Sequence, residues 1–117
     1  MLDMILVGFV ALIQVYIMIF EIFMWERRGP KVFGSFPEDL FQKTTALAGN
    51  QGLYNGFLAA GLIWSMLIGD PVWNTNVATF FLLCVAVAGL YGAATVEKKI
   101  ILVQTLPASV ALLALYL

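Results

Sequence analysis

Histidine is absent from this 117-residue chain, and Cys84 is its only cysteine. These absences exclude an internal disulfide, zinc sites built on histidine and cysteine, haem held by two histidines and any catalytic triad that uses histidine. Cys84 lies in an apolar run, where we expect a buried and inert thiol. The sequence therefore predicts no metal site and no cofactor.

Charge is also scarce, because only 11% of the residues are Asp, Glu, Lys or Arg and the net charge is −1. Such a chain offers no basic field for nucleic acid. Apolar residues make up 62% of it, whereas a soluble domain is about half apolar and about a quarter charged. This composition cannot cover a water-facing surface, which excludes a soluble globular enzyme and predicts a protein embedded in a lipid bilayer.

Four apolar runs follow one another along the chain, at residues 2–25, 45–68, 77–96 and 100–117. As helices they can each cross a hydrocarbon core of about 30 Å, the last one barely. The runs are continuous rather than alternating, which argues against a β-barrel. The prediction is therefore one all-α transmembrane domain, an antiparallel up-and-down bundle of four helices.

The basic residues fall in only two of the connections between these runs. They are Arg27, Arg28, Lys31, Lys43, Lys98 and Lys99. Four crossings put both connections on the same side of the membrane, and the positive-inside rule makes that side cytoplasmic. Both termini are then expected on the non-cytoplasmic side. The second basic connection, residues 97–99, is short enough to allow only a tight antiparallel hairpin.

The longer basic connection, residues 26–43, contains a motif that is typical of a helix start. Ser35 and Glu38 are spaced as in a capping box, and Pro37 falls in what would be the first turn. We expect a capped helix to begin near Phe36 and either to lie at the membrane surface or to continue into the second span.

Glu21 is an acidic residue well inside the first apolar run. It lies six residues before Arg27, which places it about 9 Å inside the membrane boundary in a straight helix. A carboxylate that faces lipid there costs about 2 kcal/mol or more, so Glu21 should face protein or water, be protonated, or pair with a base such as Arg28. Gln14, two helical turns earlier, occupies nearly the same angular position.

The second apolar run opens with a cluster of polar side chains on one arc of the helix. Asn50, Gln51, Tyr54 and Asn55 form this cluster, and Gln104 of the last run adds an amide at a similar depth. Amides cannot face lipid without unmet hydrogen bonds. We therefore expect this arc to face protein or water.

A ridge of small residues lies on nearly the opposite side of the same helix. Gly52, Gly56 and Ala60 recur every four residues, a spacing that suits a close helix neighbour. With polar groups on one side and the ridge on the other, this helix is expected at the centre of the bundle.

Two interpretations of the polar groups remain open. In the first, the amides hold helices together, at about 0.6 kcal/mol each. In the second, they line a cytoplasm-facing pocket for a small polar ligand or a lipid headgroup. The residues of this pocket would be Gln14, Glu21, Asn50, Gln51, Tyr54, Asn55 and Gln104.

The segment Leu47–Gly61, which reads LAGNQGLYNGFLAAG, together with Tyr16–Trp25 and Lys31–Phe33, resembles a family of small bacterial and fungal membrane proteins. The family is known as domain of unknown function thirteen-oh-four, and the likeness spans nearly the whole chain. It implies a four-helix integral membrane protein, in a bacterial cytoplasmic membrane, without an assigned activity. Members commonly carry Glu-His where this chain has Ile13-Gln14, so Gln14 argues against proton-transfer chemistry here.

Three functions are compatible with these features. The first is binding or transport of a small molecule through the polar pocket. The second is an intramembrane enzyme that acts on a lipid or isoprenoid, with Glu21 as general acid or base and Tyr54 as proton donor. A single buried acid without histidine or metal makes an enzyme the less favoured choice. The third is a structural or accessory subunit, or a homo-oligomer, that associates through Gly52, Gly56 and Ala60.

Overall fold

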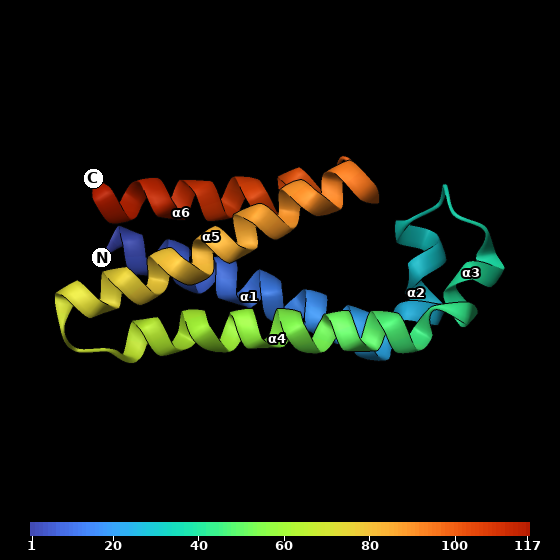
Figure 1. Ribbon diagram of the computed structural model, residues 1–117, viewed down its shortest axis with the longest axis horizontal. Helices are drawn as coiled ribbons and strands as arrows, with labels where there is room; N and C mark the ends of the chain where they lie inside the picture. The colour runs from blue at the N-terminus through green and yellow to red at the C-terminus, as the bar shows by residue number, and fades with distance from the viewer.

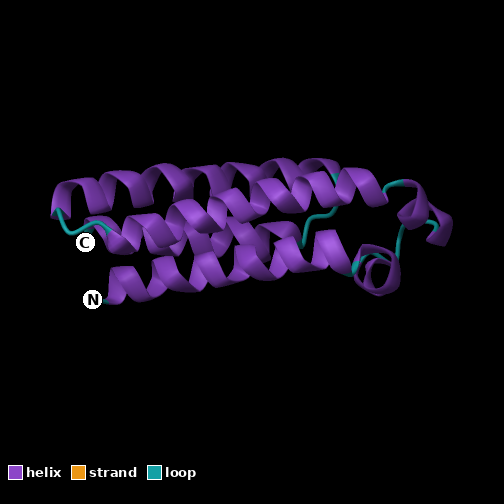
Figure 2. Cartoon of the chain, turned by 90° about the horizontal axis from the view of Figure 1, so that it is seen from below, coloured by secondary structure: helices purple, strands orange, loops and turns teal.

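The computed structural model describes all 117 residues and contains helices but no strand. Four long helical segments run antiparallel along the 48 Å axis of the molecule (Figure 1). They are α1 (Leu2–Phe23), α4 (Thr45–Leu67), α5 (Pro71–Thr95), and the π-helix η1 (Ile101–Thr105) continued by α6 (Leu106–Tyr116). Two short helices, α2 (Trp25–Val32) and α3 (Glu38–Lys43), lie beyond one end of the bundle, and both termini lie at the other (Figure 2). The all-α prediction is confirmed.

Three of the four long segments follow the apolar runs, whereas α5 begins at Pro71 rather than at residue 77. The Asp70 side chain accepts a hydrogen bond from the Val72 N–H at 3.1 Å and so caps the helix. Pro71 occupies the first turn, where its missing N–H costs nothing. These signals precede the apolar run, so hydropathy alone does not locate the start of α5.

The connection at residues 26–43 differs most from the sequence expectation. The capped helix start near Phe36 is wrong, because α3 begins at Glu38 and has no side-chain cap from Ser35 or any other residue. Pro37 has φ −59° and ψ 142°, an extended conformation. Since a proline disfavours helical backbone in the residue before it, Phe36 cannot open this helix.

Two breaks in the backbone turn the α2–α3 segment (residues 25–43) away from the long helices. Met24, at φ −124°, separates α1 from α2, and Thr44, at φ −114°, separates α3 from α4. The Trp25 indole N–H donates to Thr44 Oγ1 at 2.9 Å, so the two breaks are tied together. Gly29 allows α2 to lie on Phe41, since a Cβ there would approach Phe41 Cδ1 to 2.5 Å.

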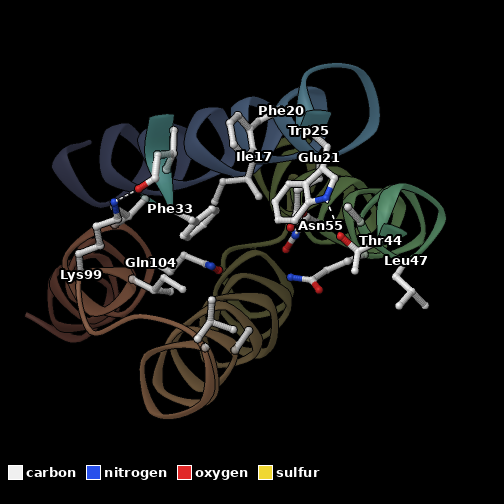
Figure 3. Close-up of a pocket in the computed structure, with 18 of the residues that line it drawn as sticks. Ile17, Phe20, Glu21, Trp25, Phe33, Thr44, Leu47, Asn55, Lys99 and Gln104 are labelled. Atoms are coloured by element: carbon white, nitrogen blue, oxygen red, sulfur yellow. Dashed lines mark hydrogen bonds between the residues drawn. The ribbon is translucent and has the colours of Figure 1, made fainter. Parts of the chain in front are cut away.

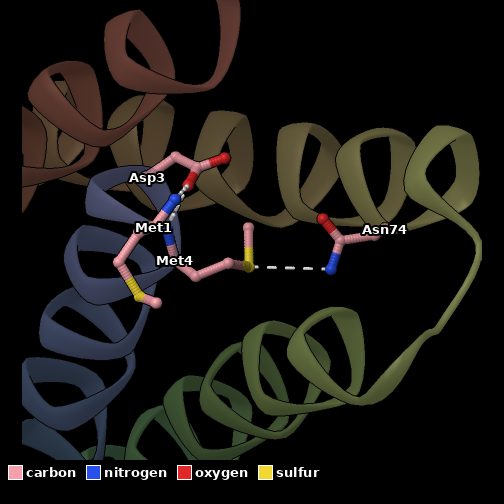
Figure 4. Close-up of polar contacts among 4 residues, drawn as sticks. All are labelled: Met1, Asp3, Met4 and Asn74. Atoms are coloured by element: carbon pink, nitrogen blue, oxygen red, sulfur yellow. Dashed lines mark hydrogen bonds and ion pairs between the residues drawn. The ribbon is translucent and has the colours of Figure 1, made fainter.

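The hydrophobic core fills the half of the bundle nearest the termini. It consists of Val7, Val10, Ala11, Leu62, Ala78, Leu82, Val85, Ala86, Ala108 and Ala111, which come from α1, α4, α5 and α6. At the edge of this half, Asn74 of α5 donates to the Ser65 carbonyl at 2.7 Å, and its Nδ2 lies 3.6 Å from Met4 Sδ (Figure 4).

The expectation that α4 is the central helix is wrong, because α1 and α5 each contact every other long segment and α4 does not. Helix α4 packs along α1 and α5 but does not touch α6. The physical reason lies in its side chains, because only two faces of α4 permit a close neighbour, one with Gly52 against α1 and one with Gly61 against Phe81 of α5. The other faces carry large apolar residues such as Leu53 and Phe57, which are exposed.

Only 23 of the 117 residues are buried, and large apolar side chains are exposed along all four long segments. By length and composition, α1 and α5 are able to cross a membrane. The other two expected spans do not meet that criterion: α4 carries the amide cluster, and the apolar segment Ile101–Tyr116 is shorter.

Candidate functional site

A cavity of about 460 Å³ lies at the end of the bundle that carries the α2–α3 segment, and it opens to the surface, since lining residues such as Leu47 and Val96 are exposed. Its wall is made by 21 residues, 14 of them hydrophobic, from all the helices except α6 and from the connections beside α2, α3 and α5. Small-molecule sites typically occupy about 300–1,000 Å³ and combine a mostly apolar wall with a few polar groups. The cavity has both properties.

The cavity exists because α5 leaves α4 and joins η1 as it crosses the bundle (Figure 1). Near the 68–70 connection the two helices touch, where Gly61 of α4 lies directly under the Phe81 ring. Further along, Gly89 of α5 packs against Thr105, whose Oγ1 donates to the Ala86 carbonyl at 3.0 Å. The opening left between α4 and α5 widens toward the α2–α3 segment.

Small residues on α5 keep this space open. Ala88 and Gly92 face the cavity from α5, while Leu47, Ala48 and Gln51 face it from α4. A larger side chain at residue 88 would take up part of this volume, whereas a Cβ at residue 92 would meet Ile100 Cγ2 at 3.2 Å. Small residues of α5 therefore contribute to this opening as much as the residues of α4 do.

Glu21 of α1 lines the cavity and is only 7% exposed. Its Oε1 accepts a hydrogen bond from Asn55 Nδ2 at 2.6 Å, and its Oε2 has no hydrogen-bond partner in the chain. The expected pairing with Arg28 does not form. The ion pairs of the chain join the N-terminus to Asp3, Lys43 to Asp39 and Lys99 to Glu97, so the buried carboxyl group has no basic partner.

A close contact between α1 and α4 holds Glu21 and Asn55 together. A Cβ on Gly52 would lie 2.9 Å from Ile22 Cγ1 and 3.0 Å from Glu21 Cβ, and one on Gly56 would lie 2.6 Å from Met18 Sδ. These two glycines are thus covered by α1 of the same chain. Ala60, the third residue of the expected ridge, is exposed and takes no part in the contact.

Gln104 brings an amide to the cavity from the last helical segment. It lies in η1, where the Leu106 N–H bonds to the Ile101 carbonyl five residues back. Pro107 has no N–H to offer to the Val103 carbonyl, so the ordinary helical ladder is interrupted here. Such π-helical turns are rare and frequently occur at functional sites.

Gln14 lies behind the wall of the cavity, next to Gln104, and is completely buried. Its Nε2 is 3.5 Å from Gln104 Oε1, at the outer limit of a hydrogen bond, and its own Oε1 has no partner. The polar groups therefore end at Gln14. Beyond it, toward the termini, the bundle is filled by core residues such as Val10 and Leu82.

The structure brings together four of the seven residues expected in the pocket. Glu21, Gln51, Asn55 and Gln104 line the cavity, and Gln14 adjoins it through Gln104. Figure 3 shows Glu21, Asn55 and Gln104 directed toward one space from α1, α4 and η1.

Asn50 and Tyr54 do not line the cavity, and both are exposed. Each is two residues from Gly52, which places it about 160° around the helix from the face packed on α1. The inward face instead follows Ala48, Gly52 and Asn55. The expected pairing of Glu21 with Tyr54 as acid and proton donor is therefore not assembled.

Sequence reasoning did not find the aromatic wall of the cavity. Phe20, Trp25, Phe33 and Phe36 all line it. Ring centroids are 5.9 Å apart for Phe20 and Trp25, 5.9 Å for Trp25 and Phe33, and 6.1 Å for Phe33 and Phe36. The aromatic residues between positions 20 and 36 were a signal, but only the folding back of the α2–α3 segment brings them to Glu21.

Lys99 fastens the hairpin between α5 and η1 to the α2–α3 segment at the rim of the cavity. Its Nζ donates to the Val32 carbonyl (Figure 3) and lies 5.4 Å from the centroid of the Phe33 ring. The same nitrogen is 3.7 Å from Glu97 Oε2. No group of three His, Cys, Asp or Glu side chains lies close enough to hold a metal ion.

The chain is similar to proteins whose names state no activity. The sequence model of the family described as protein of unknown function (DUF1304) matches residues 8–116. The uncharacterized protein YpaA of Lactococcus lactis subsp. lactis (strain IL1403) is 34% identical over 97 residues, which cover 81% of this chain and 80% of that protein. No solved structure matches the chain.

Proposed function

This chain belongs to the DUF1304 family of proteins of unknown function, and we propose that it is an integral membrane protein whose cavity binds a small molecule or a lipid headgroup. The observation that carries this proposal is the carboxyl group of Glu21, whose side chain is mostly buried beside an empty, mostly apolar space, while its Oε2 stays accessible and has no partner in the chain. A group of this kind is expensive to bury without a partner. A ligand in the cavity supplies that partner.

The surface of the bundle supports a location in the bilayer. Large apolar side chains such as Phe9, Leu53, Phe80 and Leu113 are exposed on the four long segments. Soluble monomers rarely expose contiguous apolar patches of more than a few hundred Å². Lipid tails, in contrast, are a favourable neighbour for these side chains.

The distribution of charge supports the expected orientation in a cytoplasmic membrane. The six lysines and arginines lie in the α2–α3 segment and the hairpin at residues 97–99, at one end of the bundle, whereas Asp3 and Asp70 lie at the other. By the positive-inside rule the first of these ends is cytoplasmic. The cavity lies at that end and so faces the cytoplasmic half of the bilayer.

Binding is better supported than passage through the bundle. The polar groups stop at Gln14, and the hydrophobic core fills the bundle from there to the termini. Transport therefore requires a second conformation in which this core opens. Association of subunits through the glycine ridge is also less supported, because α1 already covers Gly52 and Gly56.

Native mass spectrometry of the protein in lipid nanodiscs tests the proposal. The expected result is a bound small molecule or retained lipid on the natural protein, and its loss from Ala88→Phe, which fills the cavity. Leu90→Phe, on an exposed position of the same helix, is the matched control and should retain the bound molecule. Equal occupancy of the two variants, or no bound species on the natural protein, would count against a binding role.

A further inference from the structure

We infer that the ligand of this cavity carries a substituted ammonium group on an apolar body, an inference that rests on the proposed binding function. Two independent features of the wall point to this chemistry. One is a buried carboxyl group without a basic partner, and the other is a set of aromatic rings at different orientations around the same space.

Glu21 is the acidic member of the wall, and its hydrogen bonding is half complete. Asn55 satisfies Oε1 at 2.6 Å, while Oε2 has no donor within the chain. The basic residues nearest in sequence, Arg27 and Arg28, are exposed on α2 and form no ion pair with it. A cationic ligand completes this site, because a buried carboxylate needs an opposite charge or several hydrogen-bond donors.

The aromatic rings of the wall pack edge-on or tilted against one another, so their planes point in different directions along the cavity. The planes of Phe20 and Trp25 meet at 85°, those of Phe20 and Phe33 at 64°, and those of Trp25 and Phe33 at 54°. Trp25 has already used its indole N–H on Thr44, so it has no donor left for a ligand. Faces of aromatic rings attract cations, and substituted ammonium groups are held in such cages.

The chain already contains one contact between a cation and an aromatic ring of this wall, made by Lys99. Its ammonium lies 5.4 Å from the centroid of the Phe33 ring, at the rim of the same cavity. It is also the one basic residue in the wall, but it donates to the Val32 carbonyl and lies 3.7 Å from Glu97 Oε2. Because Lys99 is held at the rim by these two partners and no second basic residue lines the wall, the wall offers an anion less than it offers a cation.

The apolar part of the wall determines what else the ligand contains. Fourteen of the 21 lining residues are hydrophobic and the space is about 460 Å³, which suits an ammonium group attached to an aryl or alkyl body. Both an amine-bearing lipid headgroup and a free amphipathic amine have this chemistry. The experiment distinguishes these two sources.

The test uses Trp25 as a reporter inside the cavity. Trp64 and Trp73 are exposed, so Trp64→Phe and Trp73→Phe leave Trp25 as the only indole. The protein, in nanodiscs of phosphatidylglycerol, is titrated with benzyltrimethylammonium, with its uncharged carbon isostere neopentylbenzene, and with phenylmethanesulfonate. We expect the cation to bind about tenfold more tightly than the isostere, because the charge of Glu21 and the faces of the aromatic rings act together on it, and the sulfonate to bind most weakly.

Two pairs of variants assign this preference to the cavity. Glu21→Gln keeps an oxygen that accepts from Asn55 but removes the charge, and should reduce the preference for the cation to about twofold or less. Glu38→Gln makes the same charge change on the exposed start of α3 and should leave the preference intact. Phe33→Leu should weaken binding of the cation more than binding of the isostere. Phe57→Leu, on the exposed face of α4, should alter the binding of neither compound.

The outcomes separate this inference from the proposed function. Equal binding of cation and isostere, tighter binding of the sulfonate, or an unchanged preference in Glu21→Gln would overturn the inference and leave a binding cavity in place. If none of the three compounds, and no phosphatidylethanolamine added to the nanodiscs, changes Trp25 fluorescence, the binding function itself fails. Competition between phosphatidylethanolamine and benzyltrimethylammonium identifies a lipid headgroup as the source of the ammonium group. Absence of this competition identifies a free amine as the source. Both outcomes support the inference.

Discussion

Asn55 of α4 donates a hydrogen bond of 2.6 Å to Glu21 of α1, and the two side chains are 8% and 7% exposed. The bond joins helices that are distant in the sequence at the point where the cavity meets the packed interface. It leaves Glu21 Oε2 without a partner in the chain, in a side chain that lines the cavity.

Asn55→Leu should lower the free energy of unfolding by about 1–3 kcal/mol, because it leaves a buried carboxyl group without its only hydrogen bond. Asn50→Leu makes the same chemical change on the exposed side of α4 and should stay within about 0.5 kcal/mol of the natural protein. Reversible unfolding in detergent micelles measures both. Equal stability of the two variants would show that the hydrogen bond adds nothing.

Gly52→Ala should push α1 and α4 apart and destabilise the protein by about 1–3 kcal/mol, since overpacking forces backbone shifts. The added Cβ would lie 3.1 Å from the Met18 carbonyl oxygen, a backbone atom that cannot easily move. Gly49→Ala is the control, because nothing lies within 4 Å of its Cβ and an alanine in a helix is worth about 0.5–1 kcal/mol over glycine. The midpoint of thermal unfolding should be higher for Gly49→Ala than for the natural protein and lower for Gly52→Ala. The reverse order would refute the close contact between α1 and α4.

Lys99→Met should loosen the α2–α3 segment, because it removes the hydrogen bond to the Val32 carbonyl and the contact with the Phe33 ring. A loss of about 1.4 kcal/mol in local stability corresponds to tenfold faster amide exchange. Hydrogen–deuterium exchange should show this change in residues 25–43 and not in the core of α5. Lys98→Met, at the neighbouring exposed position, is the control and should leave the exchange of that segment unchanged. A similar effect of both variants would show that Lys99 makes no specific contribution to holding the α2–α3 segment.

The orientation in the membrane is open to labelling in intact bacterial cells. With Cys84→Ala removing the natural thiol, Gly69→Cys in the connection between α4 and α5 should react with a membrane-impermeant maleimide. Ser35→Cys, in the connection between α2 and α3, should react only after lysis, because the positive-inside rule puts that end in the cytoplasm. The opposite pattern would place the cavity on the outer side and invalidate the proposed topology.

The sequence allows the long helices to be predicted well, because continuous apolar runs mark them directly. It marks the start of α5 through Asp70 and Pro71, which precede the apolar run and act through capping rather than hydropathy. The helix start near Phe36 failed because the restriction that Pro37 puts on its neighbour outweighs the capping spacing of Ser35 and Glu38.

Some residues of the cavity could be predicted from the sequence and others could not. The geometry of α4 separates the two groups. Glu21 and Asn55 were identified because polar groups avoid lipid, but the same rule selected Asn50 and Tyr54, which lie on the outer side of the helix. A helix shows one face to a given neighbour, and the position of Gly52 decides which one. The aromatic wall was beyond sequence reasoning, since it depends on how the α2–α3 segment folds back over α1.

An experimental structure of the protein in a lipid nanodisc tests the central claim most directly. We predict non-protein density in the space between Glu21 and Gln104, with a ligand atom at hydrogen-bonding or ionic distance from Glu21 Oε2, about 2.7–4 Å. A collapsed space in which side chains of the bundle fill the cavity, or a Glu21 carboxyl group turned outward to the lipid, would contradict the account.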